Sequence, residues 1–103
     1  MPITIALQTI DNKKLEQIIP DASQVSINEW LPLGDPSYPM LQHIDEYGDT
    51  IFNGLQMREF LIEWNRLTET LTDTNQCKLA SEIRRLAEKC RSKPHTFLRF
   101  IGD

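Results

Sequence analysis

The sequence predicts a single α+β domain over residues 1–103, an antiparallel β-sheet with an antiparallel two-helix hairpin packed on one face. Three observations support this prediction. Apolar residues alternate with polar ones near the N-terminus, they recur at spacings of three and four between residues 55 and 92, and aromatic and β-branched residues dominate residues 95–101. Two helices that lie between strands are typical of a two-layer fold, so the C-terminal strand is expected to return to the sheet.

The N-terminal residues predict a β-hairpin. Ile3, Ile5 and Leu7 alternate with more polar neighbours, which is the period-two pattern of a strand with one buried face. A turn-forming Asp-Asn-Lys segment follows, and residues 15–19 can return as the second strand. A short helix over residues 13–19 is the competing interpretation of the same segment.

The next part of the chain is rich in proline and predicts short elements around a loop. Four of the six prolines fall in residues 20–40, and residues 30–40 are expected to form a loop. Alternation of apolar and polar residues indicates a short strand over residues 24–28. A second hairpin is predicted from strands at residues 41–45 and 50–53, joined by a Tyr-Gly turn.

Two amphipathic helices are predicted over residues 55–71 and 74–92, with a short link that favours antiparallel packing. Asn53 and Asp73 precede them as N-cap residues. Each is followed three residues later by glutamine, the pattern of a capping box. Pro94 ends the second helix, and the last strand begins after it.

The two cysteines indicate a reducing compartment. Cys77 and Cys90 are thirteen positions apart on one predicted helix, which separates them by about 20 Å along its axis. A disulfide needs Cα atoms within about 7 Å, so the two cannot pair with each other. The N-terminus lacks the pattern of a signal peptide and no apolar run is long enough for a membrane span. We therefore expect a cytoplasmic protein without a membrane partner.

Charge is distributed unevenly along the chain. The formal net charge is −4, yet residues 1–53 hold two basic residues against eight acidic ones, while residues 54–103 hold nine against seven. The late basic residues fall near the end of the second predicted helix, where cations are stabilised by the helix dipole. Acidic residues interrupt this basic group, and nucleic-acid binding normally requires a clearly basic domain. The charge pattern therefore argues against a nucleic-acid partner.

The favoured interpretation is a non-enzymatic protein-binding domain of the immunity or antitoxin type, which neutralises a toxin by contact. Its expected docking surface is the predicted acidic hairpin, with binding residues at Tyr38, Asp45, Glu46, Tyr47 and Asp49. An acidic surface of this kind attracts a basic protein partner and raises the rate of association. The competing interpretation is a polar turn that only protects a sheet edge from aggregation.

Motifs for catalysis are missing from the sequence. There is no Gly-rich phosphate loop, no Gly-x-Ser-x-Gly and no His-Glu-x-x-His, and the acidic group matches no EF-hand or zinc spacing. We therefore assign no catalytic residue and expect neither a cofactor nor a metal. The alternative function is a small enzyme or ligand-binding domain, with a pocket between residues 30–40 and the start of the last strand near His43, Asp49 and His95.

Several apolar residues leave two interpretations open. Leu55 and Ile62 fall nearly opposite the buried stripe of the first helix. Either a further layer covers them, or they form an exposed apolar spot that supports a homodimer; an unpaired edge strand is another route to a homodimer. Trp30 and Tyr38 are expected to form a lid on the core, with an interface role as the alternative.

Two segments of the chain resemble a known group of proteins. Residues 47–53 have the pattern YGDT-x-FN, followed by Gln56, Met57 and Trp64, and residues 93–103 read KPHTFLRFIGD. Together they resemble a group of small uncharacterised bacterial proteins with a similar C-terminal half. The resemblance implies a bacterial, cytoplasmic, stand-alone domain. That group has no assigned activity, so the resemblance transfers no site residue.

Overall fold

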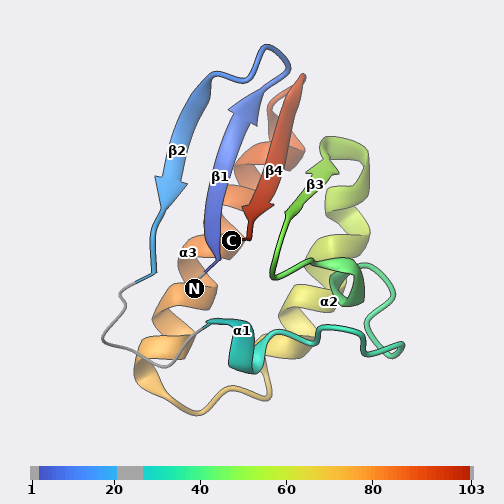
Figure 1. Cartoon of the computed structure of the whole chain (residues 1–103), viewed down its shortest axis with the longest axis vertical. Coiled ribbons are helices and arrows are strands. Elements are labelled where there is room, and N and C mark those ends of the chain that lie inside the picture. The colour runs from blue at the N-terminus through green and yellow to red at the C-terminus, as the bar shows by residue number, and fades with distance from the viewer. Residues whose placement is uncertain (1–2, 21–26, 103) are drawn as a thin grey trace.

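The computed structural model describes residues 3–20 and 27–102 (Figure 1). A four-stranded antiparallel sheet forms one layer and two helices run behind it as the second, which confirms the predicted fold class (Figure 1). The sheet has the order β2-β1-β4-β3. Its strands are β1 (Thr4–Thr9), β2 (Lys14–Ile18), β3 (Asp49–Asn53) and β4 (Thr96–Ile101). The helices are α1 (Ile27–Trp30), α2 (Met57–Thr68) and α3 (Thr74–Ser92), with 3-10 helices η1 (Leu41–His43) and η2 (Gly54–Gln56).

The N-terminal hairpin forms as predicted, and the helical interpretation of residues 13–19 is wrong. β1 pairs with β2 on one side and with β4 on the other, both antiparallel. The register shifts after Leu7, which leaves Leu15 as an extra residue in β2, a β-bulge. Ile5 and Leu7 lie on the face that the helices cover, and both are buried.

The predicted strand at residues 24–28 and the predicted second hairpin are wrong. Ile27 begins the short helix α1, and residues 24–26 lie outside the described residues. Residues 41–45 do not form a strand, because η1 covers Leu41–His43. Leu41 and Ile44, three residues apart, are both buried, which is a helical spacing rather than an alternation. β3 forms as predicted but pairs with β4.

The two predicted N-cap residues cap helices: Asp73 caps α3, and Asn53 caps η2, which leads directly into α2. Asn53 accepts from the N–H of Gln56, and the Gln56 side chain accepts from the N–H of Asn53, which completes the capping box at the start of η2 and α2. The Asp73 side chain accepts hydrogen bonds from the first-turn amides of α3. The predicted bounds of the second helix are confirmed, whereas α2 ends at Thr68, before Leu71.

Aromatic side chains fill the space between the two layers. Phe60 of α2 stacks on Trp64 with ring centroids 5.5 Å apart, and Phe52 and Phe100 of the sheet approach Phe60 at 5.2 Å and 6.0 Å. Trp30 packs against this core, 5.9 Å from Trp64. The predicted lid role of Trp30 is therefore confirmed.

Ion pairs connect the outer strand β2 to α3. Glu16 of β2 accepts from Arg85 at 2.7 Å and also from Lys89. The hydrogen bonds from these two cations lower the pKa of the Glu16 carboxyl, and the bond from Lys89 has the larger effect. Part of the late basic group is thus used to attach the sheet edge to the helix layer.

Within the described residues, no helix has the length and apolar character needed to cross a membrane.

Candidate docking surface

The acidic residues lie in a tight turn between η1 and β3. The Asp45 side chain accepts from the N–H of Tyr47 at 2.8 Å, and the Thr50 hydroxyl accepts from the N–H of Asp45 at 2.9 Å. The first of these bonds is an Asx-turn, in which a short side chain replaces a backbone acceptor. The turn therefore has a defined conformation set by its own sequence.

The C-terminal residues hold this turn from the other side. Gly102 donates its N–H to the carbonyl of Gly48 at 2.7 Å, which extends the β3–β4 pairing by one residue. A Cβ atom at position 102 would lie 2.6 Å from the carbonyl carbon and oxygen of Glu46. Only glycine allows so close an approach of the two backbones.

Gly102→Ala is expected to displace the turn and to lower the free energy of unfolding by about 1–3 kcal/mol, because the added methyl group overlaps the Glu46 carbonyl. Chemical denaturation gives the loss, and amide chemical shifts of residues 45–48 report the displacement. Gly34→Asn is the control, since Gly34 has φ +71° with open space around it and asparagine tolerates this conformation. Equal amide shifts at residues 45–48 in both variants would contradict the prediction.

The turn brings four of the five predicted binding residues together. Asp45 and Tyr47 are exposed, Tyr47 to 77%. Glu46 is half-buried and accepts from the side-chain amide of Asn28 at 3.2 Å. Asp49, at the start of β3, pairs with Arg99 of β4. All three carboxylates therefore have partners within the chain that fix their positions.

The fifth predicted residue, Tyr38, makes a different contact. The Arg66 guanidinium lies over its ring at 4.3 Å from the centroid, and Arg66 also donates to the carbonyl of Ser37. Tyr38 is half-buried against the core, which confirms the expected lid role. Its described contacts do not connect it to the acidic turn.

Within the described residues, the three residues of the alternative pocket, His43, Asp49 and His95, do not lie together. Asp49 lies opposite Ile101, at the end of β4, whereas His95 precedes the first residue of that strand. Six strand residues separate these positions, a distance of about 20 Å. His43 is exposed at the end of η1. No group of acidic, histidine or cysteine side chains within residues 3–20 and 27–102 could hold a metal ion.

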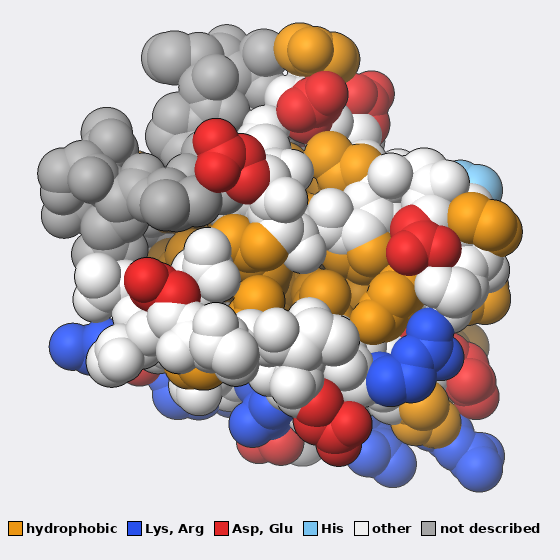
Figure 2. All heavy atoms as spheres, turned by 90° about the horizontal axis from the view of Figure 1, so that it is seen from below, with side chains coloured by type: hydrophobic (Ala, Val, Ile, Leu, Met, Phe, Trp, Pro, Cys, Tyr) orange, Lys and Arg blue, Asp and Glu red, His pale blue; other side chains and the backbone are white. Residues whose placement is uncertain are grey.

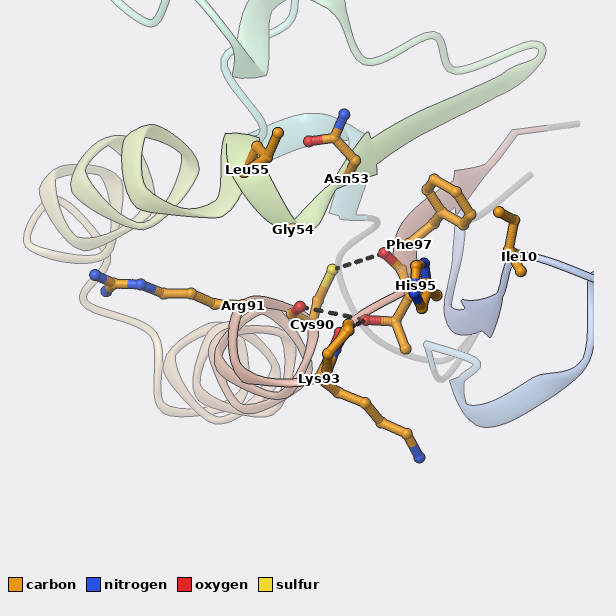
Figure 3. A pocket seen from close by; sticks show the side chains of 11 residues that line it. Ile10, Asn53, Gly54, Leu55, Cys90, Arg91, Lys93, His95 and Phe97 are labelled. Atoms are coloured by element: carbon orange, nitrogen blue, oxygen red, sulfur yellow. Dashed lines mark hydrogen bonds between the residues drawn. The ribbon is translucent and has the colours of Figure 1, made fainter.

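His95 instead lies beside an apolar pocket at the opposite end of the sheet. The pocket has a volume of about 450 Å³, and its lining includes Leu55, Phe97, His95 and Cys90. In Figure 3 the Cys90 sulfur points into the space next to Gly54, while Arg91 and Lys93 extend away from it. His95 has φ 61° and accepts from the N–H of Ile10 through its carbonyl, so it forms the turn into β4.

The Cys90 thiol in this pocket is an unsuitable nucleophile. It is fully buried, and its Sγ lies 3.6 Å from the carbonyl oxygen of Thr96, to which it donates. Burial raises the pKa of Cys90, so the protonated thiol is favoured over the reactive thiolate. Cys77 is half-buried near the start of α3, and neither cysteine forms a disulfide.

Exposed apolar residues are a second feature of the surface. Leu55 is 92% exposed and Ile62 is 54% exposed, so the interpretation in which a further layer covers them is wrong. Ile51 of β3 is also 54% exposed. Periodicity identified Leu55 and Ile62 as off the buried stripe, whereas Ile51 lay in a predicted strand without any signal of its exposure.

Sequence reasoning missed one buried acidic residue, Glu63. It is only 6% exposed, and its carboxylate accepts from the N–H groups of Met40 and Leu41 at 2.9 Å and 3.0 Å. The available signal was its place on the helical wheel, directly beside the buried stripe of α2.

Comparisons with family models, with curated proteins and with solved structures find no match to this chain.

Proposed function

We propose that this chain is a non-enzymatic protein-binding domain of a bacterial cytoplasm, of the immunity or antitoxin type, and that the acidic turn at residues 45–49 captures a basic protein. The observation that supports this most is the fixed geometry of the turn. Its exposed Tyr47 stands among three carboxylates, and the hydrogen bonds of Asp45 and Gly48 hold it in place. A preordered loop loses little conformational entropy on binding.

The wider surface fits the same kind of partner. Seen from the end that carries α1 and the α2–α3 connection, an apolar area has acidic side chains at several places around it, and basic side chains lie along one edge of this view (Figure 2). Exposed aromatic residues serve as anchors in many interfaces, and surrounding charges select the partner. An immunity or antitoxin protein acts by covering a surface of its target, a role that needs a complementary surface and no catalytic group.

The proposal is tested by removing the charges without disturbing the turn. The variant Asp45→Asn, Glu46→Gln, Asp49→Asn keeps an acceptor oxygen for Tyr47 and for Asn28. The wild-type protein, used as bait, is expected to recover a basic protein from lysate. Calorimetry with that purified protein should then show binding at least tenfold weaker for the variant, and a smaller dependence on salt.

A matched control changes the net charge by the same amount elsewhere. Asp11→Asn, Glu59→Gln, Glu88→Gln also moves the formal charge from −4 to −1 and affects three exposed residues outside the turn. This control should bind as the wild type does. Equal weakening by both variants would mean that net charge matters and the turn does not. A wild-type bait that recovers no specific protein would refute the proposed function.

A further inference from the structure

β3 is an outer strand, and its pairing with β4 shows which of its backbone groups remain free. Gly102 donates to Gly48, and in antiparallel sheets the hydrogen bonds join opposed residues in every second pair. The next bonded positions of β3 are therefore Thr50 and Phe52, opposite Phe100 and Leu98. The alternate residues of β3 direct their N–H and C=O groups away from β4.

These outward groups belong to Asp49 and Ile51, together with the carbonyl of Asn53. The N–H of Asn53 is already used, because it donates to the Gln56 side chain in the capping box. No hydrogen bond of the outward amides of Asp49 and Ile51 occurs among the described residues. The edge thus offers donors and acceptors in the spacing that another antiparallel strand needs.

The other edge of the sheet has the protection that β3 lacks. β2 carries the bulge at Leu15, and its charged residues include Lys14 and Glu16. Bulges and charges are common devices against edge pairing. In β3 the register with β4 is regular, and the central residues Thr50, Ile51 and Phe52 are uncharged.

Exposed apolar residues are arranged symmetrically about the centre of β3. Tyr47, Ile51 and Leu55 are exposed to 77%, 54% and 92%, and they are spaced four residues apart. If two copies pair antiparallel about Ile51, the two Ile51 residues oppose each other. Tyr47 and Leu55 lie just beyond the two ends of β3, in the preceding turn and in η2, so the strand pairing itself joins the two Ile51 residues.

The charges favour the same register. Pairing about Ile51 places Asp49 opposite Asn53 of the second copy, whereas pairing about Asp49 would place two carboxylates opposite each other. Asp49 is also compensated within its own chain by Arg99. The register that joins the apolar residues is therefore free of the like-charge contact.

We infer that β3 is a homodimer interface, in which β3 of two copies pair antiparallel about a two-fold axis at Ile51 to form one continuous sheet. The two Ile51 residues exchange hydrogen bonds, and each Asp49 N–H donates to the Asn53 carbonyl of the second copy. Such an interface is isologous, as a two-fold axis requires. The interface uses the backbone of Asp49, but its tests substitute no residue of the acidic turn at residues 45–49, so a failure to dimerise and a failure to capture a partner are distinguishable.

Oligomeric state is the first test, with a control that the chain itself offers. Ile51 and Ile62 have the same exposed fraction, 54%, so Ile51→Lys and Ile62→Lys make the same change on β3 and on α2. Sedimentation at about 100 μM should give twice the 12.0 kDa chain mass for the wild type and for Ile62→Lys, and a single chain for Ile51→Lys. A monomeric wild type, or a dimer that only Ile62→Lys disrupts, overturns the inference.

Cross-linking is the second test, and it reports the register. In a Cys77→Ser background, Ile51→Cys places two thiols opposite each other across the two-fold axis, within the reach of a disulfide. Asn53→Cys, two residues along the same edge, opposes Asp49 and should not cross-link. Rapid air oxidation to a dimer is expected for Ile51→Cys alone. Faster cross-linking through position 53, or equal rates, would contradict the register.

Discussion

Replacing Trp64 with alanine is expected to lower the free energy of unfolding by about 3–5 kcal/mol. Trp64 is fully buried, stacks on Phe60 with an interplanar angle of 9°, and lies against Trp30. Its Nε1 donates to the Ala80 carbonyl of α3 at 2.9 Å, which joins the two helices. Alanine removes the ring, the stacking partner and this hydrogen bond together, and leaves a cavity between the layers.

Circular dichroism during denaturation is the suitable measurement, because Trp64 is one of only two tryptophans and its loss alters the fluorescence signal. A domain of this size has a total stability of about 5–15 kcal/mol, so Trp64→Ala can unfold the chain entirely. Trp64→Phe is therefore measured in parallel. It keeps the stacking and loses the hydrogen bond, and about 1–2 kcal/mol is the expected loss. A loss below about 1 kcal/mol for Trp64→Ala would contradict the central place of Trp64 in the core.

The helices and the N-terminal hairpin could be predicted because their determinants are local. Asp73 caps α3 through amides two and three residues away, and Pro94 follows the end of the helix. The alternation in β1 likewise identifies Ile5 and Leu7 as residues of the hydrophobic core, although Ala6 and Gln8 on the other face are also buried. Periodicity and capping residues act over one or two turns of chain, so a single sequence contains them in full.

The conformation of residues 41–45 could not be predicted, because a distant residue determines it. The backbone amides of Met40 and Leu41 find their acceptor in Glu63, more than twenty residues later in the chain. The choice of β4 as the partner of β3 is also non-local, since the predicted hairpin would have paired β3 with the residues just before it. Tertiary contacts of this kind override local strand preference.

The candidate site likewise has a part that the local sequence predicts and a part that depends on distant contacts. Asp45, Glu46, Tyr47 and Asp49 are neighbours in sequence, so their clustering followed from the chain itself. Tyr38 was placed with them on residue type alone, and the position of Arg66 on α2 gives it another contact. The free edge of β3 depends on the sheet order, which no local pattern specifies.

Replacing Glu63 with leucine is expected to lower the free energy of unfolding by about 2–4 kcal/mol, although leucine is apolar and the site is buried. Both carboxylate oxygens accept from Met40 N–H, at 2.9 Å and 3.1 Å, and one also accepts from Leu41 N–H at 3.0 Å. Leucine fills similar space but leaves the buried Leu41 amide and the half-buried Met40 amide without an acceptor. Chemical denaturation measures the loss, and hydrogen exchange of the two amides should become faster than in the wild type.

Two further variants separate the hydrogen bonds from the change in size and polarity. Glu59→Leu makes the same substitution on an exposed position of α2 and should change stability by no more than about 0.5 kcal/mol. Glu63→Gln keeps one acceptor oxygen and should fall between the wild type and Glu63→Leu. If Glu63→Leu matches Glu59→Leu in stability and leaves amide exchange at Met40 and Leu41 unchanged, then the carboxylate does not hold residues 40–41 against α2, and a different contact determines the conformation of η1.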